Sequence, residues 1–184
     1  MEAIKPGNHY TYADYYSWDD GKRYELIDGA AYLMEPSPKW EHQDVSTQLI
    51  SQINGYLKGK PGKVFQSPFD VRLNADADDD TVLQPDIVVF CDRSKLSGTG
   101  CVGAPDMVIE ILSPSSRSRD KLVKFNQYLL AGVREYWIVD PDEKTVQACI
   151  LKHGGYDIIM HVEADEVPVH VLHDCMIKLA EVFE

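Results

Sequence analysis

The sequence predicts an α/β fold in which a mixed central β-sheet is flanked by helices, and three observations lead to this prediction. Two short apolar runs, 84–90 and 106–112, are rich in β-branched residues and have the length of strands buried on both faces. Between residues 40 and 57, apolar residues recur every four positions, which is typical of a helix with one buried stripe. A helical segment then separates the second apolar run from a third at 136–139. This strand–helix–strand order indicates that the flanking strands run parallel.

The first half of the chain is expected to begin with a short aromatic helix at 12–19 and a hairpin at 24–34. The dipeptide Asp28-Gly29 predicts the turn of that hairpin, since both residues tolerate a positive φ. The helix at 40–57 ends in the segment 58–62, which contains two glycines and a proline. A strand is expected at 64–73, where Pro68 marks an irregularity or an edge. The glycine-rich segment 94–103 is expected to form a loop.

The second half is expected to hold a helix from about Arg117 to Ala131, which Gly132 ends. Strands are expected at 136–139, 145–151 and 156–161, and a short helix at 176–182. Repeats, linkers and low-complexity tracts are absent from the sequence, so we expect a single domain over residues 1–184.

The composition is that of a globular protein of the reducing cytoplasm. The chain has 184 residues, of which 44% are hydrophobic and 26% are charged. Its four cysteines form no Cys-x-x-Cys pair, which is typical of reduced, mostly buried thiols. The first residues lack the apolar core of a signal peptide, and no apolar run approaches the length of a membrane span. We therefore expect a cytoplasmic protein without a membrane partner.

The charge is unevenly distributed along the chain. The formal net charge of −12 argues against a protein that simply coats nucleic acid. Between residues 113 and 134, however, five basic residues (Arg117, Arg119, Lys121, Lys124 and Arg134) stand against one acidic residue, Asp120. Two interpretations stay open, a basic patch for a polyanion backbone and an ordinary solvated helix face.

Each of the first two apolar runs carries one carboxylate. Asp86 opens the first run and Glu110 lies in the middle of the second. A lone ionised carboxylate in such surroundings costs several kcal/mol unless a partner compensates it, and neither run contains Lys or Arg. A salt bridge from Glu110 to an arginine elsewhere and a loop-capping role for Asp86 are the structural alternatives. The pair together predicts a site for Mg²⁺ or Mn²⁺, which prefer oxygen ligands, and therefore a metal-dependent enzyme.

Six segments in order carry a resemblance to a known family: 24–29, 67–73, 84–86 (Gln84-Pro85-Asp86), 103–106, 110–115 and 131–141. They resemble the Uma2 family of bacterial endonucleases, within the PD-(D/E)XK nuclease superfamily, over roughly residues 12–151. The resemblance implies a restriction-endonuclease-like core, hydrolysis of phosphodiesters and a Mg²⁺ or Mn²⁺ cofactor.

The resemblance also implies roles for individual residues. Asp86 matches the first metal-ligating acid and Glu110 the second. The superfamily lysine is expected two positions after the second acid, where this chain has Leu112. In families of this kind a lysine on the following helix takes over. Lys124 fits that role and Lys121 is the alternative.

Four further residues are weaker candidates for the same site. Glu25 resembles an extra N-terminal acid of such sites, although strand alternation alone would equally allow an exposed residue. Asp70 and Gln84 are candidates for supporting contacts. His42, at the start of a predicted helix, is expected at the surface or lining the cleft.

The sequence therefore predicts an endonuclease, with DNA as substrate and Asp86, Glu110, Glu25 and Lys124 as its catalytic residues. The alternative is a non-catalytic nucleic-acid-binding or regulatory protein that retains the nuclease fold, which the acidic net charge and the displaced lysine favour. By analogy with similar folds that cut two strands, we expect a homodimer.

Overall fold

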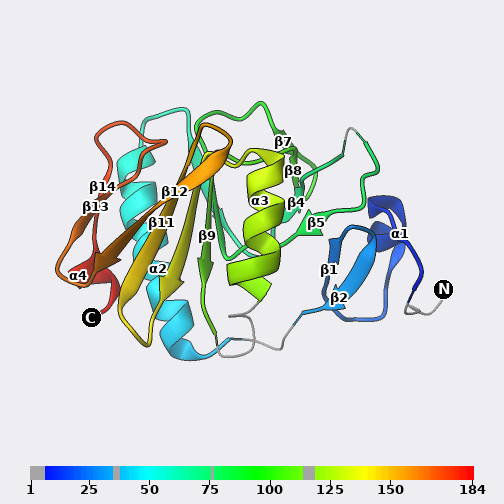
Figure 1. Ribbon diagram of the computed structural model, residues 1–184, viewed down its shortest axis with the longest axis horizontal. Helices are drawn as coiled ribbons and strands as arrows, with labels where there is room; N and C mark the ends of the chain where they lie inside the picture. The colour runs from blue at the N-terminus through cyan, green and yellow to red at the C-terminus, as the bar shows by residue number, and fades with distance from the viewer. Residues whose placement is uncertain (1–6, 35–37, 76, 114–118) are drawn as a thin grey trace.

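The computed structural model describes residues 7–34, 38–75, 77–113 and 119–184. Two six-stranded mixed sheets lie next to each other along the long axis of the molecule, and helices cover them (Figure 1). We call them the central sheet and the N-terminal sheet. A two-stranded sheet, β13 (Glu166–Pro168) and β14 (Met176–Lys178), lies near the C-terminus with the helix α4 (Leu179–Val182). The predicted α/β fold with a mixed sheet and flanking helices is confirmed.

The central sheet has the order β12-β11-β10-β9-β6-β3. In that order its strands span Gly155–Val162, Thr145–Lys152, Glu135–Asp140, Met107–Ile111, Ile87–Phe90 and Lys63–Gln66. Strands β9 and β10 are parallel, as the strand–helix–strand order predicts, and the other pairs are antiparallel. The segment between β9 and β10 contains a π-helical turn, Arg119–Lys124, which continues into α3, Phe125–Ala131.

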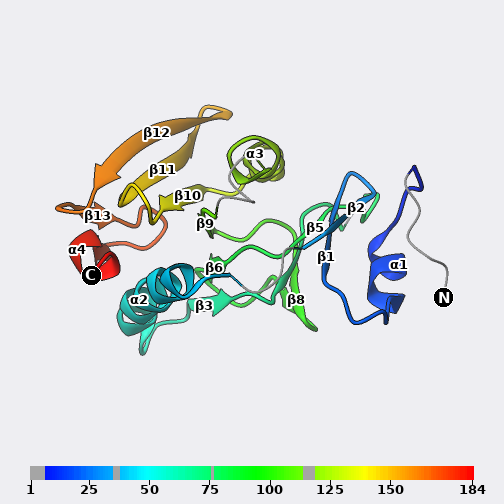
Figure 2. The same ribbon diagram turned by 90° about the horizontal axis from the view of Figure 1, so that it is seen from below.

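Helices cover both faces of the central sheet. The predicted helix at 40–57 is confirmed as α2, Trp40–Leu57, which lies on one face, while α3 lies on the other (Figure 2). Alternate residues of each strand enter opposite cores: Ile87 and Val89 pack with α2, whereas Val88 packs with Tyr128 of α3. A strand in this position needs apolar side chains on both faces, and for that reason the sequence shows unbroken apolar runs here.

The N-terminal sheet has the order β2-β1-β5-β4-β8-β7. Its strands span Ala30–Leu33, Tyr24–Ile27, Val82–Leu83, Asp70–Arg72, Gly100–Val102 and Leu96–Ser97 in that order. The hairpin β1–β2 turns at Asp28 and Gly29, with φ of 51° and 74°, as the Asp-Gly dipeptide predicts. The first helix, α1 (Tyr12–Ser17), lies against this hairpin at the end of the molecule (Figure 2).

Three sequence predictions differ from the structure. The strand predicted at 64–73 is divided into β3 and β4, which belong to different sheets and flank a cis Ser67-Pro68 peptide bond. The loop predicted at 94–103 contains the short strands β7 and β8, whose glycines hide the apolar alternation of a strand. The helix predicted at 176–182 begins as β14 and becomes helical only at Leu179.

Some predictions lie outside the described residues. The predicted helix start at Arg117 is one of them, and so is the N-terminal segment 1–6. Within the described ranges, none of the helices has both the length and the apolar character that crossing a membrane requires.

Gly100 is expected to be indispensable for the contact between β8 and β4. A Cβ atom at this position would lie 1.9 Å from the backbone oxygen of Asp70, so Gly100→Ala forces the two strands apart. We expect a loss of about 1–3 kcal/mol or more in the free energy of unfolding, measured by urea denaturation. The control is Gly55→Ala in the exposed last turn of α2, where nothing lies within 4 Å of the added Cβ atom. That variant should gain about 0.5–1 kcal/mol, and equal behaviour of the two variants would contradict the packing argument.

Candidate functional site

Glu110 is a buried carboxylate on β9 that faces α3. Its neighbours Ile109 and Ile111 both belong to the core beneath α2, so strand alternation directs Glu110 to the opposite face of the sheet. The side chain is 3% exposed. Its Oε1 atom accepts a hydrogen bond from the hydroxyl group of Tyr128 at 2.8 Å and lies 3.0 Å from the Nζ atom of Lys124.

Lys124 joins Glu110 to a second buried acid, Glu25. Its Nζ atom lies 2.9 Å from Oε1 of Glu25 and 3.0 Å from Oε1 of Glu110. Lys124 is the last residue of the π-helical turn, one helical turn before Tyr128. The spacing i, i+4 therefore places both donors on the helix face toward Glu110. The formal charges of Glu25, Glu110 and Lys124 sum to −1.

Glu25 lies on β1 of the N-terminal sheet and is 2% exposed. Its Oε1 atom also accepts a hydrogen bond from the backbone N–H of Gln84 at 2.9 Å. The sequence left open whether Glu25 is an exposed strand residue or an acid of the site. Its burial shows that Glu25 is not an exposed strand residue. The ion pair with Lys124 therefore connects the N-terminal sheet, the central sheet and the start of α3.

Tyr128 acts as a neutral donor to Glu110. Burial and, after it, the charge of the Glu110 carboxylate raise the pKa of Tyr128 well above its usual value. Its hydroxyl group therefore stays protonated at neutral pH and keeps its hydrogen bond. The sequence gives no sign of this hydrogen bond, which depends on how the helix packs on β9.

Asp86 lies next to Glu110 at the edge where β6 begins. The antiparallel register pairs Ile87 with Ile109, so Asp86 precedes β6 at the position opposite Glu110. Its Oδ2 atom accepts a hydrogen bond from the backbone N–H of Ile111 at 2.8 Å and lies 3.2 Å from Nε2 of His42 on α2. The side chain of Asp86 is 24% exposed. The site thus has a buried acid, Glu110, and an acid that solvent can reach, Asp86.

His42 is a site residue whose position the sequence predicts only loosely. It lies in the first turn of α2, and its side chain is 12% exposed. The sequence interpretation placed it at the surface or lining the cleft, and the contact with Asp86 agrees with the second of these. A histidine at a helix start carries no sequence signal for a partner more than forty residues away.

Asp70 and Gln84 form a separate polar group beside Glu25. The Nε2 atom of Gln84 donates a hydrogen bond to Oδ1 of Asp70 at 2.9 Å, and the hydroxyl group of Tyr15 donates to the same oxygen at 2.8 Å. Burial, followed by the Asp70 charge, raises the pKa of Tyr15 and keeps its hydroxyl group protonated. The backbone N–H of Gln84, which donates to Glu25, connects this polar group to the site and gives it a supporting role there.

Two of the basic residues between 113 and 134 have described side chains, Lys124 and Arg134. Neither of them contributes to the predicted basic patch. Lys124 is 5% exposed and belongs to the buried ion pair. Arg134 lies 2.6 Å from Oδ1 of Asp106, which neutralises its charge locally. The side chains of Arg117, Arg119 and Lys121 lie outside the described residues, so the choice between Lys124 and Lys121 rests on the observed contacts of Lys124 alone.

The donor set at Asp86 and Glu110 fits a hard divalent cation. Both contacts that hold the Asp86 carboxylate, with the Ile111 N–H and with His42, involve its Oδ2 atom. They therefore orient the Oδ1 atom without binding it. Mg²⁺ is commonly held by one or two carboxylates together with waters and substrate phosphates. In the described part of the chain, no group of three or more His, Cys, Asp or Glu side chains is arranged to hold a metal.

Comparison with models of known protein families shows which family the chain belongs to. A family model, Uma2, described as "Putative restriction endonuclease", matches residues 12–177. The chain belongs to the Uma2 family. The Uma2 match covers every residue of the site, from Glu25 to Tyr128, and it confirms the resemblance that the six sequence segments carry.

Two similar proteins match most of the length of this chain. The "Uncharacterized protein slr1290" of Synechocystis is 27% identical over 156 residues, which are 83% of this chain and 80% of that protein. A crystal structure from Anabaena variabilis, described as "a putative nuclease belonging to DUF820", superposes with a TM-score of 0.75 at 22% identity. The alignment covers 95% of this chain and 97% of the Anabaena chain. At this identity the superposition shows that the two proteins share a fold.

Removing the charge of Lys124 is expected to destabilise the protein strongly. Lys124→Met leaves Glu25 and Glu110 buried without their ammonium partner, and breaking a buried pair in this way costs about 3–5 kcal/mol. The free energy of unfolding from urea denaturation measures the loss. The control is Lys144→Met, since Lys144 forms an exposed pair with Glu163 and should contribute less than about 1 kcal/mol. Equal losses in the two variants would show that the buried ion pair does not hold the sheets together.

Proposed function

We propose that this Uma2 protein is a metal-dependent endonuclease that hydrolyses DNA, with Asp86 and Glu110 as the residues that hold Mg²⁺ or Mn²⁺. The single observation that carries the proposal is the placement of Glu110. It is buried on a central strand, in contact with Lys124 from the following helix and opposite Asp86 in the strand register. A family described as "Putative restriction endonuclease" and a structural neighbour described as "a putative nuclease" support the same reaction class.

The acids and the lysine have distinct tasks in the proposed reaction. A bound divalent ion supplies Lewis acidity toward a phosphoryl oxygen and lowers the pKa of a bound water. Asp86 is held by Ile111 and His42, so its carboxylate is already oriented before substrate arrives. Tyr128 fixes the rotamer of Glu110 in the same way. The ammonium group of Lys124 offsets negative charge that develops on the phosphoryl oxygens, and Glu25 holds this ammonium group in place.

Cleavage is expected to depend on both acids of the site. Glu110→Gln and Asp86→Asn should each lower the rate of plasmid cleavage with Mg²⁺ or Mn²⁺ by at least about a hundredfold. The reason is that a metal ion supplies several kcal/mol of transition-state stabilisation and each 1.36 kcal/mol is a factor of ten. Wild-type cleavage should stop in excess chelator. The control is Glu163→Gln, which neutralises an exposed acid in an exposed ion pair.

Two results would contradict the proposal. The first is cleavage by Glu110→Gln at the wild-type rate. The second is a folded wild-type protein that neither cuts single- or double-stranded DNA nor takes up Mn²⁺ in a calorimetric titration. The second result would support the alternative function, a nucleic-acid-binding or regulatory protein. The observation that favours this alternative is that the buried Lys124 already compensates both Glu25 and Glu110 in an ion pair of protein groups alone.

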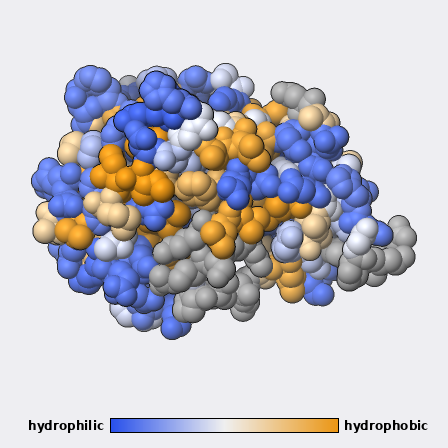
Figure 3. Space-filling view, viewed as in Figure 1, coloured by the Kyte–Doolittle hydropathy of each residue, from blue (hydrophilic) through white to orange (hydrophobic). Residues whose placement is uncertain are grey.

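We further propose that the protein acts as a homodimer. Strand β12 forms an edge of the central sheet, and it exposes Ile158, Met160 and Val162 by 52%, 58% and 54%. Figure 3 shows apolar side chains on the face that carries β12 and α3. An apolar edge strand of this length is a ready template for pairing with a second copy.

The mass in solution tests this proposal. Light scattering on the purified protein should give twice the chain mass of 20.8 kDa, because two β12 edges would pair. Met160→Glu places a charge in the middle of that edge and should shift the protein toward one chain. The matched control is Glu166→Gln on β13, outside the β12 edge. A wild-type protein with the mass of a single chain would overturn the proposal.

A further inference from the structure

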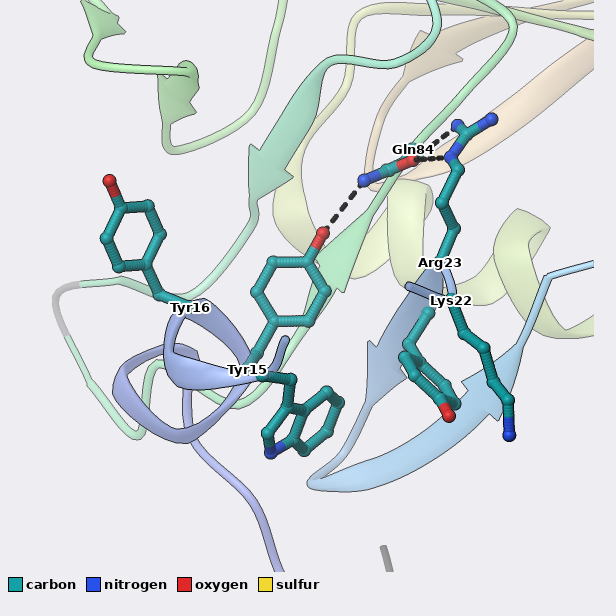
Figure 4. A pocket seen from close by; sticks show the side chains of 7 residues that line it. Tyr15, Tyr16, Lys22, Arg23 and Gln84 are labelled. Carbon is teal, nitrogen blue, oxygen red and sulfur yellow. Dashed lines mark hydrogen bonds between the residues drawn. The ribbon is translucent and has the colours of Figure 1, made fainter. Parts of the chain in front are cut away.

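A small pocket opens beside α1, at the end of the N-terminal sheet. Its volume is about 200 Å³, and Figure 4 shows the side chains that line it. Aromatic rings make up most of the wall: Tyr15, Tyr16, Trp18 and Tyr24. Pockets for whole drug-sized ligands occupy about 300–1,000 Å³. This pocket is therefore suited to one planar ring rather than to a larger molecule.

The aromatic wall combines a fixed part with an accessible part. The ring centroid of Trp18 lies 5.2 Å from that of Tyr24 and 5.8 Å from that of Tyr15, both in edge-to-face geometry. These contacts hold the indole ring in place. Tyr16, in contrast, is 67% exposed, and its ring packs on Tyr12 alone among the described aromatic residues. An exposed ring beside a fixed one provides a surface on which a planar ligand stacks.

Two cations lie at the same pocket, Lys22 and Arg23. Among the described residues, neither forms an ion pair with a carboxylate. Arg23 instead donates hydrogen bonds from Nε to Oε1 of Gln84 at 3.1 Å and from Nη2 to Oγ of Ser67 at 2.7 Å. Asp20 lies beside Lys22: its carboxylate accepts hydrogen bonds from the hydroxyl group of Tyr24 at 2.7 Å and from the backbone N–H of Lys22 at 3.0 Å. Arg23, whose hydrogen bonds go to neutral groups, is therefore the more available of the two cations, in a chain with a net charge of −12.

The pocket is directly connected to the acids of the candidate site. Figure 4 shows Gln84 between the hydroxyl group of Tyr15 and the guanidinium group of Arg23. The backbone N–H of Gln84 donates to Glu25, and the backbone N–H of Ser67 donates to the carbonyl oxygen of Asp86 at 3.0 Å. Both residues that Arg23 contacts are thus one hydrogen bond away from an acid of the site.

We propose that this pocket binds one unstacked base of a single-stranded nucleic acid, with the phosphate of the same nucleotide against Arg23. Aromatic rings that stack bases and cations that follow the backbone are the two features of proteins that bind single strands. The proposal rests on the proposed function, because it places the adjoining phosphate toward Asp86 and Glu110. A duplex keeps its bases stacked, so the pocket selects single-stranded or locally opened substrates.

Binding without cleavage tests the proposal. Fluorescence anisotropy in excess chelator compares a labelled single-stranded DNA, an RNA of the same sequence and the DNA duplex. Tyr16→Ala and Arg23→Gln should each weaken binding of the single strand about fivefold or more, while Tyr16→Phe, which keeps the ring, should bind like the wild type. Arg23→Gln should also reduce the salt dependence of binding. Lys178→Gln removes an exposed cation near the C-terminus and serves as the charge control. The affinities for the DNA and RNA single strands show which backbone the pocket prefers.

The outcomes separate this proposal from the nuclease proposal. If Glu110-dependent cleavage is observed but Tyr16→Ala and Arg23→Gln bind like the wild type, the pocket proposal is wrong and the nuclease proposal stands. If the two variants lose binding and the wild type cuts nothing, the pocket proposal stands and the nuclease proposal falls. Equal affinity of the wild type for single strand and duplex, or no binding of any nucleic acid, overturns the pocket proposal.

Discussion

The ammonium group of Lys124 between Glu25 and Glu110 is the interaction on which the rest of the site depends. Glu25 lies on the N-terminal sheet, Glu110 on the central sheet and Lys124 at the start of α3, so one buried charge connects three parts of the fold. Burying a carboxylate without a partner costs several kcal/mol, and the ammonium group of Lys124 offsets this cost for both acids. The ion pair therefore ties the position of the helix after β9 to both sheets.

The same interaction sets the chemistry that the site allows. Glu25, Glu110 and Lys124 carry a formal charge of −1 in sum, and Asp86 adds a third acid at the solvent edge. In the proposed site, a divalent cation held by Glu110 and Asp86 would offset this negative charge and would compete with Lys124 for the Glu110 carboxylate. Lys124 would keep its contact with Glu25 and offset the charge of a phosphate. The lysine lies in the π-helical turn before α3, while Leu112 occupies the position directly after β9.

Much of this arrangement is encoded in short sequence signals. The buried strands, the helix at 40–57 and the Asp28-Gly29 turn follow from apolar periodicity and turn chemistry, and the structure agrees with them. The pair Asp86 and Glu110 was identifiable because a charge in an apolar run needs an explanation. Lys124 was a candidate, with Lys121 as the alternative, because the resemblance implies a lysine on the helix after Glu110. Strands β7 and β8 were not identifiable, because two or three residues with glycines among them carry no alternation. They are strands because β8 pairs with β4 and β7 pairs with β8.

Contacts between distant elements account for what the sequence could not reveal. The approach of His42 to Asp86 depends on how α2 packs on the sheet, and the burial of Glu25 depends on the N-terminal sheet that covers it. The aromatic helix α1 reads in sequence only as a short amphipathic segment. Its role in forming a pocket with Arg23 and Gln84 arises from three elements that meet in space.

A crystal structure of the protein with Mn²⁺, with the anomalous scattering of manganese recorded, is the most direct measurement of the central claim. It should show one manganese peak within coordination distance of both Asp86 and Glu110, with the Lys124 ammonium group shifted from Glu110. A map at saturating Mn²⁺ without manganese at these two acids, and with Lys124 still bound to Glu25 and Glu110, would contradict the account.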